Sequence, residues 1–112
     1  MNLRQAFDLL NIRIKHDDLE EIKSTKDLER MSYFGFGQWV RNTLHLWEDN
    51  GTQDIVADIL KIPNHPKYTD GFILPGQPPR RADVDETLLH PDNCSHVMIL
   101  IYKDYLNGMV KI

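Results

Sequence analysis

Apolar side chains recur every three or four residues along most of the chain, which is the spacing of one face of an α-helix. The longer predicted helices lie near 3–10, 36–47, 53–60 and 91–106, and shorter ones lie near 17–22, 25–31 and 83–89. The expected fold is therefore mainly α-helical, a compact bundle of five or six short helices.

The strongest periodic segment carries both tryptophans of the chain. Phe36, Trp39 and Trp47 fall on one face of a single helix, so we expect both tryptophans to be buried in the core. Asn50–Gly51 is expected to end this helix, because both residue types tolerate a left-handed backbone.

The segment 91–106 is apolar on nearly every side, which is typical of a helix at the centre of a core. Pro91 suits the first position of a helix, where the backbone donor would be unpaired in any case. Asn107–Gly108 supplies a stop after the last turn. We therefore expect Leu100 and Ile101 to be largely buried.

Between residues 63 and 81 the chain changes character. Five of the six prolines lie there, and because proline fixes the backbone and lacks a donor, we expect no helix in this segment. Asp70–Gly71 separates Tyr68–Thr69 from Phe72 and the apolar residues after it, a pattern that indicates a small β-hairpin. A loop of this length often has a function.

Length, charge and cysteine content restrict the class of protein. A chain of 112 residues fits one domain, spanning 1–112. The net charge of −4 disfavours nucleic-acid binding, and no apolar run is long enough to span a membrane. Cys94 is the only cysteine, and residues 1–5 lack a signal-peptide pattern, so we expect a cytoplasmic protein without disulfides.

Two sequence patterns stand in order along the chain. Residues 34–47 read F-G-x-G-x-W-x-R-N-x-x-x-L-W, and residues 90–108 begin with H-P-D-x-x-S and end with Y-L-N-G. Together they resemble a family of small bacterial domains that has no established activity. Members of that family join the two patterns by a shorter segment, so the resemblance implies that residues 63–81 are an insertion.

Arg41 and Asn42 of the first pattern, with His90 and Asp92 of the second, are candidates for one polar cluster. Pairing of Arg41 with Asp92 would hold the start of the last helix against the tryptophan helix, because a buried charge needs a partner. Alternatively, the same four side chains would form a pocket for a small anionic or nucleotide-like ligand. The sequence allows both interpretations.

Cys94, His96 and His90 carry the remaining candidate chemistry near this cluster. Cys94 and His96 are two residues apart and lie on different sides of a helix, which disfavours a shared metal ion. His90 lies one turn before Cys94 and is a candidate base for it, but a lone cysteine on an apolar face is usually inert. We therefore expect no metal, no cofactor and a binding protein rather than an enzyme.

Aromatic and charged residues in and after the 63–81 segment are candidates for contact with a partner. They are Tyr68, Phe72, Arg80, Arg81, Asp83, Asp85 and Glu86. The two aromatics would anchor a partner or fold back over the core, and the acids would attract a basic partner or form a solvated surface. The expected function is a protein-binding module, in its most specific form an inhibitor or immunity-type protein that neutralises a partner enzyme.

Overall fold

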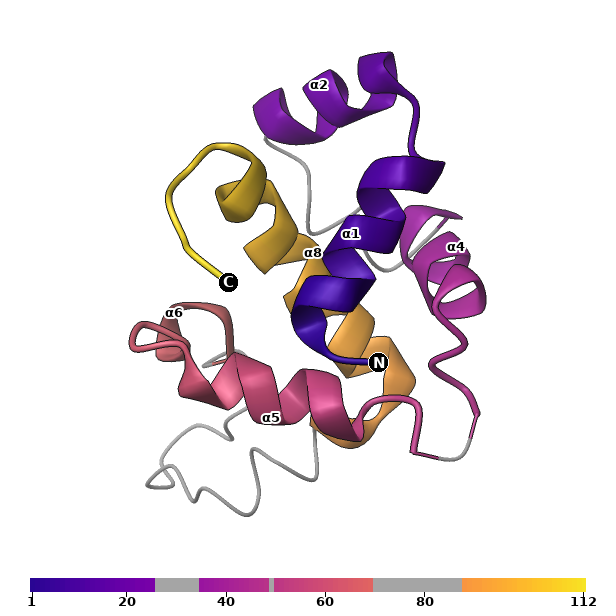
Figure 1. The fold of residues 1–112 in the computed structure, drawn as a ribbon, viewed down its shortest axis with the longest axis vertical. Coiled ribbons are helices and arrows are strands. Elements are labelled where there is room, and N and C mark those ends of the chain that lie inside the picture. The colour runs from indigo at the N-terminus through magenta and orange to yellow at the C-terminus, as the bar shows by residue number, and fades with distance from the viewer. Residues whose placement is uncertain (26–34, 49, 70–87) are drawn as a thin grey trace.

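The structure is a computed structural model that describes residues 1–25, 35–48, 50–69 and 88–112 (Figure 1). Its main helices are α1 (Leu3–Arg13), α2 (His16–Ser24), α4 (Gly35–Thr43), α5 (Gln53–Lys61), α6 (Pro66–Thr69) and α8 (Pro91–Leu106). The described ranges contain helices and turns but no strand, which confirms the predicted mainly α-helical fold.

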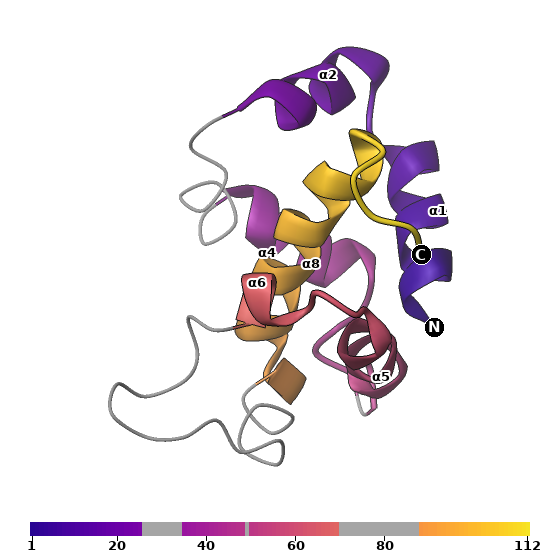
Figure 2. The same ribbon diagram turned by 90° about the vertical axis from the view of Figure 1, so that its left-hand side faces the viewer.

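Helix α8 runs through the centre of the molecule, and α1, α2, α4 and α6 pack around it (Figures 1 and 2). Its bounds are those predicted, with Pro91 in the first turn and Gly108 in a left-handed conformation after the last. Ile101 is fully buried as expected, and Leu100 is partly buried. The apolar residues on nearly every side of 91–106 therefore correctly predicted that this helix lies at the centre of the core.

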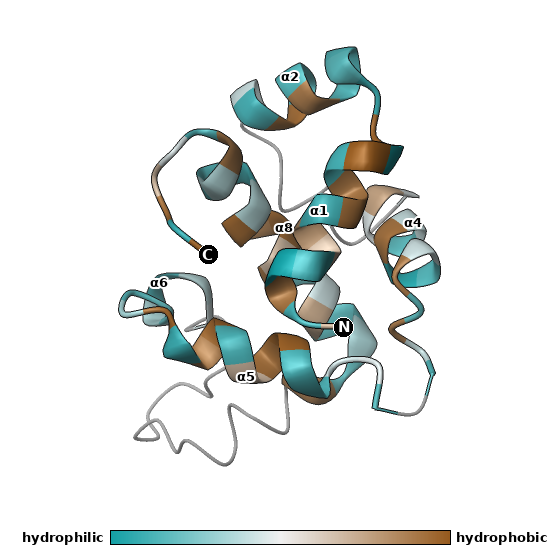
Figure 3. Cartoon of the chain, viewed as in Figure 1, coloured by the Kyte–Doolittle hydropathy of each residue, from teal (hydrophilic) through white to brown (hydrophobic). Residues whose placement is uncertain are grey.

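Helix α1 begins with a capping box, in which two orphan backbone donors are satisfied reciprocally. The Asn2 side chain accepts a hydrogen bond from the Gln5 backbone at 2.8 Å, and the Gln5 side chain accepts one from the Asn2 backbone at 2.9 Å. Phe7 on the buried side of α1 lies 4.9 Å from the ring of Tyr102 in α8. In Figure 3, hydrophobic and hydrophilic residues alternate along α1 and α5, as expected for helices that bury one side.

Helix α4 ends at Thr43, so the prediction of one continuous helix as far as Asn50–Gly51 is wrong. His45 has a φ of 56°, and this left-handed residue redirects the chain while the Leu46 backbone donates to the Arg41 carbonyl at 3.0 Å. The change of direction buries Leu46 and leaves Trp47 57% exposed.

Trp39 is 37% exposed, so the expectation that both tryptophans are buried is also wrong. The inner face of α4 is formed by Val40, Gly37 and Arg41. Trp39 precedes Val40 by one residue, a rotation of about 100° around the helix, and therefore lies at the edge of the buried face.

Tyr68 and Thr69 belong to α6, which corrects two expectations for the 63–81 segment. Pro66 stands at the first position of α6, where a missing donor costs nothing, so proline there permits a helix. The Thr69 hydroxyl donates to the His65 carbonyl at 3.2 Å, and the proposed first arm of the hairpin is therefore helical. The remainder of that hairpin, at 70–74, lies outside the described residues, as do 26–34 and most of the predicted 83–89 helix.

Candidate functional site

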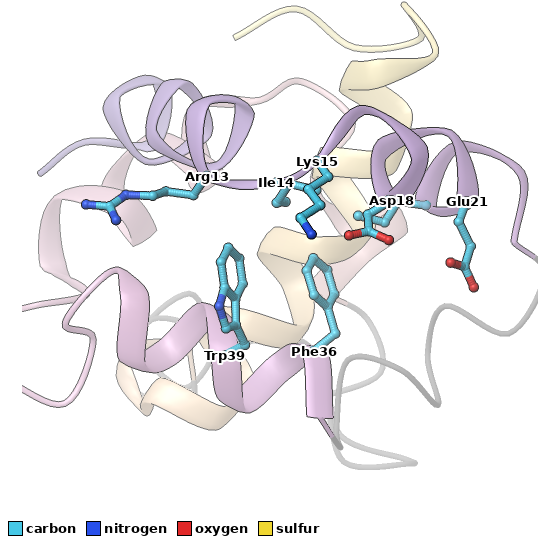
Figure 4. Close-up of a pocket in the computed structure, with 8 residues that line it drawn as sticks. Arg13, Ile14, Lys15, Asp18, Glu21, Phe36 and Trp39 are labelled. Carbon is cyan, nitrogen blue, oxygen red and sulfur yellow. The ribbon is translucent and has the colours of Figure 1, made fainter.

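An open groove lies between the α1–α2 junction and α4 (Figure 4). Its volume is about 370 Å³. It is lined by Arg13, Ile14, Lys15, Asp18, Glu21, Ile22, Phe36 and Trp39. The groove thus combines an aromatic wall on one helix with aliphatic and charged side chains on two others.

Phe36 and Trp39 form the aromatic wall of the groove. They are three residues apart on α4 and therefore lie on the same side of it. Their ring centroids are 6.0 Å apart and the ring planes differ by only 12°. Figure 4 shows both rings directed from α4 toward the α1–α2 junction. This wall presents ring surface to anything that enters the groove.

The opposite wall comes from a sharp change of direction between α1 and α2. Ile14 ends α1 with extended backbone angles, and Lys15 precedes α2 with extended angles as well. Two consecutive extended residues cannot continue a helix, so α2 turns away from the axis of α1. Ile14 therefore faces the aromatic pair, while Asp18 and Glu21 extend the wall along α2 (Figure 4).

The groove has a basic end at Arg13 and an acidic end at Glu21, with Lys15 and Asp18 between them (Figure 4). Arg13 and Lys15 lie at or before the junction, whereas Asp18 and Glu21 lie on α2. Asp18 is in the first turn of α2, where the helix dipole stabilises an acid. Among the ion pairs between described residues, none involves Asp18 or Glu21. Neither carboxylate is therefore within ion-pair distance of a described cation, although the Lys15 ammonium points toward Asp18 (Figure 4).

The predicted cluster around Arg41 is present in part. Arg41 Nε lies 3.3 Å from Asp92 Oδ1, and an Arg41 terminal nitrogen donates to the Ser95 hydroxyl at 3.1 Å. The Arg41 side chain is 10% exposed and that of Asp92 is 48% exposed. The pair joins α4 to the first turn of α8, as in the first of the two interpretations, in which it holds the last helix against the tryptophan helix.

His90 caps α8, and Asn42 stands apart from the cluster. His90 Nδ1 accepts a hydrogen bond from the Asp92 backbone at 3.2 Å, and its ring lies edge-on to Trp47 with centroids 5.9 Å apart. Asn42 follows the buried Arg41 on α4, so its side chain lies on the exposed side of that helix. The structure therefore brings together three of the four predicted residues.

Cys94 is fully buried in α8. Burial raises the pKa of its thiol to about 12, because a thiolate is poorly solvated in the core. The thiol is therefore protonated at neutral pH, which argues against its use as a nucleophile. In the described ranges, no three histidine, cysteine or acidic side chains are grouped so that they could hold a metal ion.

Tyr68 packs against α8 rather than standing free for a partner. Its side chain is 8% exposed, and its hydroxyl donates to Asp104 at 2.6 Å. Of the two interpretations of this aromatic, the structure supports packing on the core. The other predicted partner residues, Phe72, Arg80, Arg81, Asp83, Asp85 and Glu86, lie outside the described residues.

The groove itself was not predicted from the sequence. Trp39 was assigned to the core because it fits the apolar face of the tryptophan helix, and the lining residues of α1 and α2 are ordinary surface types. No residue of the groove carries a sequence signal that distinguishes it from a core or surface position.

These features define a small helical-bundle domain with an exposed aromatic groove. Within the described ranges, no helix is long and apolar enough to cross a membrane. A family profile described as a domain of unknown function, DUF6794, matches residues 1–75, and the chain belongs to this family. All the residues that line the groove lie in the matched part. Searches of curated proteins and of solved structures found no significant match.

Proposed function

We propose that this protein is a protein-binding module and that the groove between α4 and the α1–α2 junction receives the partner. The observation that carries the proposal is the stacked pair of Phe36 and Trp39, which is presented to solvent in an open groove. Aromatic side chains, tryptophan above all, contribute most of the binding energy at many protein interfaces. Phe36 is partly buried against the core and Trp39 is 37% exposed, so the pair is anchored on the core side and open to solvent on the groove side.

More specifically, we propose that the protein is an inhibitor or immunity-type protein that acts in the cytoplasm on a partner enzyme. The net charge of −4 supports this form, because an acidic surface attracts basic enzymes such as those that act on nucleic acids. The single, buried cysteine supports a reducing compartment. The sequence suggested Asp83, Asp85 and Glu86 for this role, and the exposed acids of α2 are further candidates for it.

The alternative is a site for a small anionic ligand at Arg41, Asn42, His90 and Asp92. The arrangement gives it less support, because the guanidinium already contacts a carboxylate and the Ser95 hydroxyl. An anion would have to displace Asp92 to reach Arg41. Asn42 also lies on a different side of α4.

The test compares two exposed tryptophans, one inside the groove and one outside it. The wild type, Trp39→Ala and Trp47→Ala would be used as baits in extracts of the native cell, and any captured partner would then be measured by calorimetry. We expect Trp39→Ala to weaken binding about tenfold or more, as for a central aromatic anchor. Trp47→Ala should bind like the wild type.

Equal affinity of the wild type and Trp39→Ala for the captured partner would overturn the groove as the binding surface. Thermal melting of each variant shows whether a loss of binding is only a loss of folding. If the partner is an enzyme, its activity should fall to the background rate when an equal amount of the wild-type protein is added. Full activity at that ratio would refute the inhibitor form of the proposal.

A further inference from the structure

We infer that the groove receives a basic side chain, a lysine or arginine carried on a protein segment, and this inference rests on the proposed function. The aliphatic stem of that side chain would lie on the rings of Phe36 and Trp39. Its charged head would face Asp18 and Glu21 on α2. The groove offers both kinds of contact within one volume of about 370 Å³.

The aromatic wall favours a cation over a purely apolar guest. The face of an indole or phenyl ring carries negative charge density, so it attracts an ammonium or guanidinium group placed over it. Lysine and arginine also bury their methylene stems on apolar surface while the head stays in water. The two nearly parallel rings, with Ile14 opposite, provide such a surface (Figure 4).

The carboxylates give the direction of the bound side chain. Asp18 and Glu21 are three residues apart on α2 and therefore face the same side, and both are exposed. Neither forms an ion pair with another described residue. Arg13 at the other end of the groove would repel the cationic head, so it is directed toward α2, where the Lys15 ammonium points toward Asp18 and leaves Glu21 facing away from the basic side chains (Figure 4).

The remaining acids of α2 favour basic side chains outside the groove as well. Asp17 and Glu20 are also exposed on α2, so the helix carries four acids against one lysine, Lys23, which pairs with Glu20 at 3.6 Å. A partner segment with further basic residues would be attracted to this surface. Asp17 and Glu20 do not line the groove, so their substitution removes the same number of charges from α2 and controls for its overall charge.

The experiment uses Trp39 as its own reporter. The chain has two tryptophans, so Trp47→Phe leaves Trp39 as the only one. The full chain with this substitution would be titrated with a short synthetic peptide in which arginine and leucine alternate, and with the same peptide carrying glutamate for arginine. We expect a saturable change in Trp39 emission with the arginine peptide only, and weaker binding at high salt.

Charge-neutral variants then locate the cation. Asp18→Asn with Glu21→Gln should weaken the arginine peptide roughly fivefold, as expected for two partly exposed ion pairs, while Asp17→Asn with Glu20→Gln should change it less than twofold. Equal effects of the two double variants, or equal binding of the glutamate peptide, would overturn the inference. A native partner that depends on Trp39 but not on Asp18 and Glu21 would overturn the inference alone and leave the proposed function standing.

Discussion

Some properties of individual residues follow from the sequence and others do not. The pairing of Arg41 with Asp92 could be predicted, because an arginine on an apolar helix face needs a partner when it is buried. The exposure of Trp39 and Trp47 could not, since it depends on the left-handed conformation of His45 and on the neighbours of α4. A periodic pattern shows which residues share a face but not where the edge of that face lies.

The pair of Arg41 and Asp92 should contribute to stability. Arg41→Ala is expected to lower the free energy of unfolding by about 1–3 kcal/mol, because it removes a buried side chain and its links to Asp92 and Ser95. The half-exposed position of Asp92 keeps this value below that of a fully buried pair. Urea unfolding of Arg41→Ala, Asp92→Ala and the double variant would give the coupling energy, and a coupling of zero would contradict the pairing.

Asp104 should make stability depend on acid pH. Burial raises the pKa of its carboxyl, but the hydrogen bonds from Tyr68 and Lys67, with the charges of Lys67 and Lys103, outweigh burial and hold the pKa below its usual value of 3.8. A carboxyl whose pKa is lower in the folded than in the unfolded protein stabilises the fold above its unfolded pKa. That contribution is lost as the pH falls through the folded pKa.

Asp104→Asn should therefore be less stable than the wild type by about 1 kcal/mol at neutral pH, with the difference shrinking below about pH 4. Urea unfolding at about pH 7 and about pH 3 measures both values. The exposed Asp8→Asn serves as a control that should change stability little at either pH. A stability difference between the wild type and Asp104→Asn that stays constant across this range would contradict the lowered pKa of Asp104 in the folded protein.

At the scale of helices, regular segments followed from the sequence and irregular ones did not. The bounds of α8, and nearly those of α1 and α5, agree with the apolar period and the capping residues. The early end of α4 depends on the left-handed His45, which a period of 3.6 cannot detect. A break between the helices predicted at 3–10 and 17–22 was expected, but the direction of α2 after Ile14 and Lys15 was not. The groove lies between these two irregular points, so sequence periodicity did not reveal it.

The central helix α8 should be sensitive to loss of side-chain volume. Ile101→Ala is expected to lower the free energy of unfolding by about 2–5 kcal/mol, because it leaves a cavity among fully buried neighbours. Ile12→Ala in α1 is the matched control, since Ile12 is 79% exposed and its truncation should change stability by less than about 0.5 kcal/mol. Calorimetric melting of the two variants would show whether α8 is as central as described.

At the scale of the whole molecule, the core is one cluster that draws residues from all the main helices. We therefore expect the described helices to unfold together, as most small single domains do. The physical reason is that α8 packs against helices from both halves of the described chain, while α5 joins the same unit by packing on α1.

Cys94 provides a probe of this cooperativity. Its thiol is fully buried, so an aromatic disulfide reagent should react only when the protein opens. The labelling rate should rise with urea in parallel with global unfolding, and Ile101→Ala should accelerate it in proportion to the stability lost. Fast labelling of the wild type in the absence of urea would show that α8 separates from the other helices locally.

The central position of α8 also affects how the protein is made. Ribosomes synthesise α1 through α6 before residues 91–106, so α2, α4 and α6 leave the exit tunnel before the helix on which they pack. Until α8 emerges, the apolar sides of these helices remain exposed to chaperones and to other nascent chains. The native packing of these helices is therefore completed only once residues 91–106 have emerged, and a chain interrupted before residue 91 would keep these apolar sides exposed and be a substrate for degradation.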